Sequence, residues 1–142
     1  MSARLEHANL IVRDIDATIR FIQTALPGYV VRHDAVDPDG SRWVHIGTEE
    51  SYLALNQATA EPAELWRPYT GRPGMNHLGY EVDDVDALRA RMLSASYQES
   101  TPPNSHPFRK RVYFYDPDGN DWEFVQYLTS DPAKRNDYTL PG

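Results

Sequence analysis

The stretch HANLIVRDIDA at residues 7–17 returns seventy positions later as HLGYEVDDVDA at residues 77–87. The two copies share the histidine, the valine, both aspartates and the final alanine. A repeat of this length indicates a duplicated supersecondary unit whose copies pack on one another and bring equivalent positions together. We therefore expect two related modules, with His7 and His77 at equivalent positions.

Each copy reads as a strand followed by a helix. The opening strands are expected at residues 5–12 and 75–82, and Asp14 and Asp84 are suited to cap the helices that follow. Further strands are expected at residues 29–35, 43–47 and 52–57 in the first copy and at 96–100, 112–115 and 121–127 in the second. The sequence therefore predicts an α+β fold of paired β-α-β-β-β modules.

The boundaries follow from proline and glycine content. We expect a single domain over residues 1–142, with a first module at 4–57, a linker at 58–74, a second module at 75–127 and a polar tail at 128–142. A copy of about 55 residues buries little core alone, so the copies should pack on each other or on a second chain.

Composition excludes several classes of function. A net charge of -7 argues against a nucleic-acid partner, which selects clustered lysine and arginine. The absence of cysteine excludes disulfides, thiolate metal sites and a cysteine nucleophile. No apolar run approaches the roughly 18 residues of a membrane span, and the first residues lack a signal-peptide core, so we expect a cytoplasmic protein without a membrane partner.

The chemistry is expected at His7, His77 and Glu123. Two imidazoles and a carboxylate can bind a divalent metal and leave coordination positions open. The turn in DPDGNDWE, residues 116–123, leads into a strand that would direct Glu123 inward.

These motifs resemble the vicinal oxygen chelate superfamily of glyoxalase I, extradiol dioxygenases, fosfomycin-resistance proteins and bleomycin-resistance proteins. The resemblance covers roughly residues 4–127. It implies that the paired modules form a cupped mixed sheet, that the protein is a homodimer, and that His7, His77 and Glu123 bind Fe, Mn, Ni or Zn. The substrate implied is a small molecule whose neighbouring oxygens chelate the metal.

One position departs from the glyoxalase I pattern. Where that family supplies a further ligand from the first module, this chain has Ala54, and Gln57 should point to the opposite face of its strand. The remaining set, two histidines and one carboxylate, looks more like the extradiol dioxygenases and the fosfomycin-resistance enzymes. Residues 103–111, however, lack the lysine and serine pattern expected for phosphonate binding.

Strand alternation indicates which residues surround the metal site. Asn9 lies two residues from His7, and Asn56 two from Ala54, so both are predicted to contact substrate together with Arg111. Tyr113 shares a strand face with Arg111 and is predicted to act in catalysis beside Glu123. Aligning Arg42 with Arg111 leaves His45 off this face, and His33 and His106 have no motif to support a role.

The favoured hypothesis is a metal-dependent enzyme with isomerase, lyase or ring-cleaving dioxygenase chemistry. A non-catalytic protein that binds a drug or another small molecule, as in the bleomycin-resistance branch, is the alternative. A glyoxalase I-like isomerase is a third possibility, which Ala54 disfavours.

Overall fold

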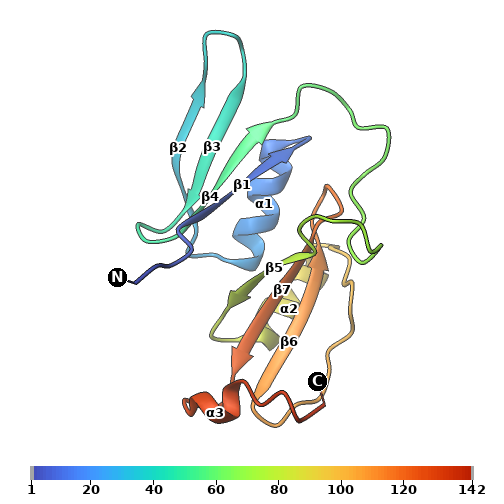
Figure 1. Ribbon diagram of the computed structural model, residues 1–142. Coiled ribbons are helices and arrows are strands. Elements are labelled where there is room, and N and C mark those ends of the chain that lie inside the picture. The colour runs from blue at the N-terminus through green and yellow to red at the C-terminus, as the bar shows by residue number, and fades with distance from the viewer. Residues whose placement is uncertain (1, 142) are drawn as a thin grey trace. The chain divides into compact units, whose positions relative to one another are not determined.

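The computed structural model describes residues 2–141, which form two compact units that divide between Leu65 and Trp66. The division falls inside the segment expected to link the two copies. Each unit has its own sheet and its own helix against that sheet (Figure 1). No helix among these residues has the length and apolar character needed to span a membrane.

The first unit is a four-stranded mixed sheet with one helix. Its elements are β1 (His7–Val12), α1 (Ile15–Ala25), β2 (Val30–Val36), β3 (Arg42–Gly47) and β4 (Tyr52–Gln57). The strand order is β1-β4-β3-β2, in which β1 and β4 are parallel and the other pairs antiparallel. This is the β-α-β-β-β order expected from the sequence.

The second unit repeats most of this arrangement. Its elements are β5 (His77–Glu81), α2 (Val85–Ser94), β6 (Arg109–Tyr115), β7 (Asp121–Tyr127) and the short α3 (Pro132–Arg135). The order β5-β7-β6 matches β1-β4-β3, with β5 and β7 parallel. Two mixed sheets with few helices confirm the predicted α+β class.

The prediction of a strand at residues 96–100 is wrong. Only a single bridge forms there, between Glu99 and Phe114. Ser96 leaves the helix with a φ of 66°, and prolines at 102 and 103 remove the backbone donors that would continue the pairing. The segment therefore meets β6 only briefly, through Ser100 N to Tyr113 O and Tyr115 N to Gln98 O.

Both helices start as predicted. Asp14 accepts a hydrogen bond from Ala17 N at 2.9 Å, and Asp84 accepts the equivalent bond from Ala87 N at 2.9 Å. These bonds satisfy backbone donors that the first helical turn leaves open. The caps fix the point at which the chain leaves each histidine-bearing strand.

Each core lies between the helix and one face of its sheet. In the first unit α1 buries Ile15, Phe21 and Ile22, whereas Ile19 and Leu26 are only half-buried. In the second unit the buried apolar side chains of β6 and β7 stand at alternate positions of their strands: Val112, Phe114, Trp122 and Phe124. The opposite sheet faces are consequently available for polar side chains.

Candidate metal centre

The second unit brings together His77 on β5 and Glu123 on β7. His77 Nε2 lies 3.0 Å from Glu123 Oε2, and the two side chains are 34% and 16% exposed. The parallel register pairs Glu123 with Gly79, where a Cβ would stand 3.8 Å from the same carboxylate oxygen. The small residue between the two ligand candidates therefore leaves that oxygen accessible.

The imidazole of His77 is held in one orientation. Its Nδ1 lies 2.7 Å from Asn76 Oδ1, an oxygen that can only accept, so Nδ1 carries the hydrogen. Its Nε2 atom faces the Glu123 carboxylate, and a proton or a cation between the two atoms would satisfy both.

The separation also fits metal binding. Two ligand atoms at right angles, with bonds of about 2.1 Å to one ion, stand about 3.0 Å apart. The donor types, a neutral imidazole nitrogen and a carboxylate oxygen, suit a borderline divalent ion. His77 and Glu123 thus fit two adjacent positions of such a metal.

Two predicted residues surround this pair. The ring of Tyr113 stands 5.7 Å from that of His77 in an edge-on arrangement, and Arg111 Nη1 lies 3.9 Å from Glu123 Oε1. Burial, and then the negative charge of Glu123, raises the pKa of the Tyr113 hydroxyl, which favours its neutral, hydrogen-donating form. Arg111 and Tyr113 share one face of β6, as predicted from the alternation.

A further pair, Tyr69 and Asp121, lies next to the centre, since Asp121 is two residues from Glu123 on β7. Asp121 is buried, and it accepts hydrogen bonds from the Tyr69 hydroxyl and from Ser100 Oγ. Burial, followed by the bond to Asp121, raises the pKa of Tyr69. Because β5 and β7 pair His77 with Asp121, these contacts tie the segment before β5 to the strand that carries Glu123.

Replacing Tyr69 with phenylalanine is expected to lower the free energy of unfolding by about 1–3 kcal/mol, because the buried Asp121 carboxylate loses a donor. Thermal unfolding followed by circular dichroism measures this. Tyr138→Phe, at a side chain 84% exposed, is the matched control and should unfold as wild type does. Equal transition temperatures for the two variants would contradict a stabilising role for the Tyr69 hydroxyl.

His7 lies on β1 in the first unit, on the face away from α1. Its Nδ1 is 2.9 Å from Glu6 Oε1, and its ring stacks on that of Tyr52 at 4.9 Å. The Tyr52 hydroxyl lies 3.4 Å from the same Glu6 oxygen. The bond from His7 lowers the pKa of Glu6 and keeps it ionised. His7 Nε2 is therefore the nitrogen left to a ligand.

The predicted substrate residues Asn9 and Asn56 are on the same sheet as His7. The register pairs Asn9 with Ala54, and strand alternation puts Asn56 on the face of Ala54. Asn9 is exposed and Asn56 half-buried.

The alignment of Arg42 with Arg111 is wrong by one residue, and this changes the position of His45. His45 pairs with Ala54 as Tyr113 pairs with Glu123, so β3 and β6 differ by 68 residues, from 45 to 113, while β4 and β7 differ by 69. Arg42 therefore corresponds to Lys110. The turn before β7 is one residue longer than the turn before β4, a difference that the strand patterns do not reveal.

His45 consequently shares the face of His7 in the first unit. Its ring stands 4.7 Å from Tyr52 and 5.1 Å from Trp43. Burial, and then the nearby cations of which Arg32 is the strongest, lowers the pKa of His45. This histidine was not selected from the sequence, because the misaligned register placed it on the face opposite to that of Arg111 and Tyr113.

Neither unit by itself assembles three histidine, aspartate or glutamate side chains into one cluster within residues 2–141. His77, Glu123, Tyr113 and Arg111 are together in the second unit, and His7, Asn9 and Asn56 are together on one sheet face in the first. The participation of His7 in the same metal site stays a prediction.

The chain belongs to the Glyoxalase/Bleomycin resistance protein/Dioxygenase superfamily, whose family model matches residues 4–124. Similar solved structures include a glyoxylase/bleomycin resistance protein/dioxygenase domain from Frankia sp. EAN1pec, at 23% identity and a TM-score of 0.74, covering 89% of this chain and 99% of that one. The fosfomycin resistance protein FosX from Mesorhizobium loti is 23% identical with a TM-score of 0.68, covering 87% and 91%.

A FosX structure from Listeria monocytogenes, an E126Q mutant in complex with Mn(II) and 1S,2S-dihydroxypropylphosphonic acid, is 20% identical with a TM-score of 0.68, covering 87% and 92%. At these identities the likeness establishes the fold. No functionally curated protein matches the sequence.

Proposed function

We propose that this chain is a metal-dependent enzyme that acts on a small molecule with neighbouring oxygens, by isomerase, lyase or ring-cleaving dioxygenase chemistry. The ligands are His7, His77 and Glu123, and the metal is Fe(II), Mn(II), Ni(II) or Zn(II). The observation that carries the proposal is the 3.0 Å approach of His77 Nε2 to Glu123 Oε2, with Nδ1 already engaged by Asn76. The Mn(II) in a FosX structure of the same superfamily supports a divalent ion.

A bound metal would act as a Lewis acid toward the substrate oxygens. The side chains around it have separate tasks. Glu123 offers Oε2 on the His77 side, while its other oxygen lies toward Arg111, which favours binding through one oxygen. The guanidinium of Arg111 is partly exposed beside Glu123, and it is proposed to pair with an anionic substrate group.

Tyr113 is proposed to donate a hydrogen bond to a substrate oxygen. Its hydroxyl is held neutral beside Glu123, and an aligned donor stabilises negative charge that develops on such an oxygen.

The active protein is proposed to be a homodimer, which sedimentation equilibrium tests directly.

The proposal is tested by assaying the purified protein after loading with each of the four metals. Methylglyoxal with glutathione tests isomerase or lyase chemistry, and catechols under air test ring-cleaving dioxygenase chemistry. Fosfomycin with water or a thiol is added because similar structures are FosX fosfomycin resistance proteins. Turnover that needs the metal and stops on chelation is the expected result. A protein that retains no metal but binds a small molecule tightly would instead favour a non-catalytic binding function.

Once a substrate is found, Tyr113→Phe is expected to lower kcat/KM by about 10–100-fold, because one hydrogen-bond donor to the reacting oxygen is lost. Metal content should not change, since Tyr113 is not a ligand. Tyr115→Phe, on the same strand, is the control. Full activity in Tyr113→Phe would exclude the proposed role of the hydroxyl.

A further inference from the structure

The two modules place different groups at the Nδ1 atoms of their equivalent histidines. Glu6 precedes His7 and Asn76 precedes His77, and each accepts the Nδ1 hydrogen of the ring, at 2.9 Å and 2.7 Å. The contact is thus repeated in both modules, but the acceptor is a charged carboxylate in the first and a neutral amide in the second.

The groups expected near the Nε2 atoms of the two histidines differ in the opposite way, with the carboxylate in the second module and none in the first. In the second module Glu123 stands 3.0 Å from His77 Nε2, whereas the first module has Ala54 at the position of Glu123. Each module therefore carries one carboxylate associated with its histidine. In the second it meets Nε2 directly, and in the first it bonds to Nδ1.

We propose that Glu6 is a positioning residue for the metal, supplying through His7 the negative charge that Ala54 lacks. This inference rests on the proposed function. A dication held by two neutral imidazoles and one carboxylate retains one positive charge, and a carboxylate hydrogen-bonded to a ligand histidine makes that ring a stronger donor. Tyr52 holds the arrangement, because its ring stacks on His7 and its hydroxyl lies 3.4 Å from Glu6 Oε1.

The charge is tested separately from the orientation by exchanging the two acceptors. Glu6→Gln keeps a carbonyl acceptor and removes the charge, and Asn76→Asp adds a charge behind the other histidine. Mn(II) is the probe, with the free ion measured by electron paramagnetic resonance during titration of the full chain. Glu50→Gln, at an exposed residue 3.8 Å from Arg4, removes the same net charge elsewhere and is the matched control.

Glu6→Gln is expected to weaken Mn(II) binding by about 10-fold, the lower end of the effect of such outer contacts, because Glu6 is exposed to solvent. The double variant Glu6→Gln/Asn76→Asp should recover most of the wild-type affinity. A purely structural role for Glu6 would not predict this recovery. Glu6→Ala should bind more weakly than Glu6→Gln, and nitrogen NMR of its metal-free form should show loss of the fixed Nδ1–H tautomer of His7.

His7→Ala separates failure of this inference from failure of the proposed function. If His7→Ala loses Mn(II) while Glu6→Gln binds as Glu50→Gln does, the role of Glu6 is overturned and the ligand set stands. If His7→Ala binds Mn(II) as wild type does, the ligand set itself is wrong, and the role of Glu6 falls with it.

Discussion

Replacing His77 with alanine is expected to lower the affinity for a divalent metal by more than about 100-fold, beyond the loss that removal of an outer-shell contact causes. The reason is geometric. His77 Nε2 and Glu123 Oε2 converge to 3.0 Å, and without the imidazole only the carboxylate remains of the pair. Metal content after dialysis, measured by elemental analysis, and Mn(II) titration both report the loss.

The control is His33→Ala. His33 lies on β2, is exposed and contacts Trp43, and it belongs to no proposed ligand set. This variant should retain the wild-type metal content. Equal metal content in His77→Ala and wild type would remove the basis for the enzyme, since a metal would then be bound elsewhere or not specifically.

Mixing the His7→Ala and His77→Ala chains extends the experiment. If the protein is a dimer and each site takes its two histidines from different chains, a mixed dimer keeps one intact site and regains up to half the metal. If each chain supplies all its ligands, mixing restores nothing. Either result also tests whether His7 is a ligand, because His7→Ala alone should be metal-poor.

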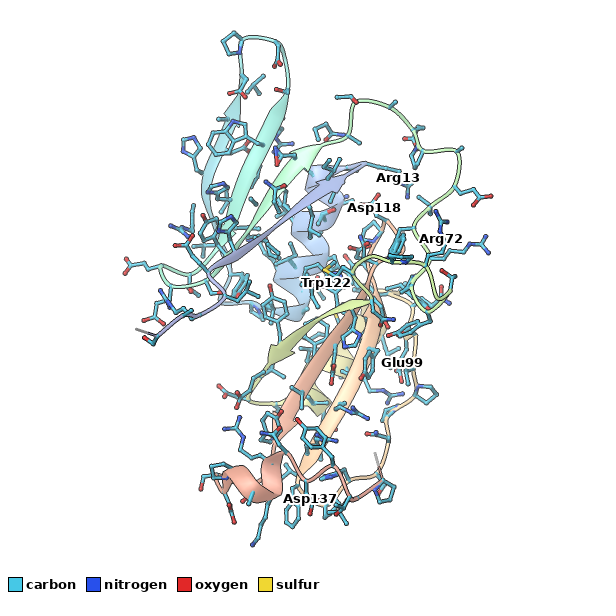
Figure 2. The ribbon with its side chains drawn as sticks, in the orientation of Figure 1. Arg13, Arg72, Glu99, Asp118, Trp122 and Asp137 are labelled. Carbon is cyan, nitrogen blue, oxygen red and sulfur yellow. The ribbon has the colours of Figure 1, made fainter. Side chains whose placement is uncertain are left out.

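Asp116→Ala is expected to lower the free energy of unfolding by at least about 3 kcal/mol, since it leaves several buried donors without an acceptor. Asp116 is buried and accepts hydrogen bonds from Asp118 N at 2.8 Å, Asn120 N at 3.0 Å and Trp122 Nε1 at 3.0 Å. Burial raises the pKa of this carboxyl, while these bonds act in the opposite direction. Figure 2 labels Asp118, which lies in the turn, and Trp122, which lies at the start of β7.

The chain contains its own control for this variant. The tetrapeptide Asp-Pro-Asp-Gly occurs also at residues 37–40, and Asp37 likewise accepts a bond from a tryptophan, Trp43 Nε1 at 3.2 Å. Asp37 is exposed, so water replaces the lost acceptor and Asp37→Ala should cost less than about 1 kcal/mol. Chemical denaturation of the two variants measures the difference. Similar midpoints would show that burial of Asp116 contributes nothing.

Asp116→Ala should also impair metal binding, because the turn at residues 116–120 sets the start of the strand that carries Glu123. A variant that is less stable but binds metal normally at low temperature would limit the role of the turn to stability.

The sequence was sufficient to predict the features that repeat or alternate. The offset of seventy identified His7 and His77 as equivalent positions. The aspartates at 14 and 84 do cap helices, and alternation placed Arg111 and Tyr113 on one face. Prediction from the sequence failed where a turn or a proline overrides the strand pattern. Turn length decided the register of β3, which moved His45 to the face of His7, and the prolines at 102 and 103 prevented the strand at 96–100.

Contacts from irregular segments could not be predicted. Tyr69 lies in the segment read as a linker, and nothing in its spacing indicates the bond to Asp121. Glu6 and Asn76 carried a usable signal, because each immediately precedes a repeated histidine, but the two residue types differ and so escape a search for identity.

The register makes His45 in the first sheet equivalent to Tyr113 in the second. One position in the strand pairing thus carries a ring with a basic nitrogen in the first unit and a ring with a hydroxyl in the second. The chemistry that each sheet face presents at this position is therefore decided by the side chain and not by the path of the strand.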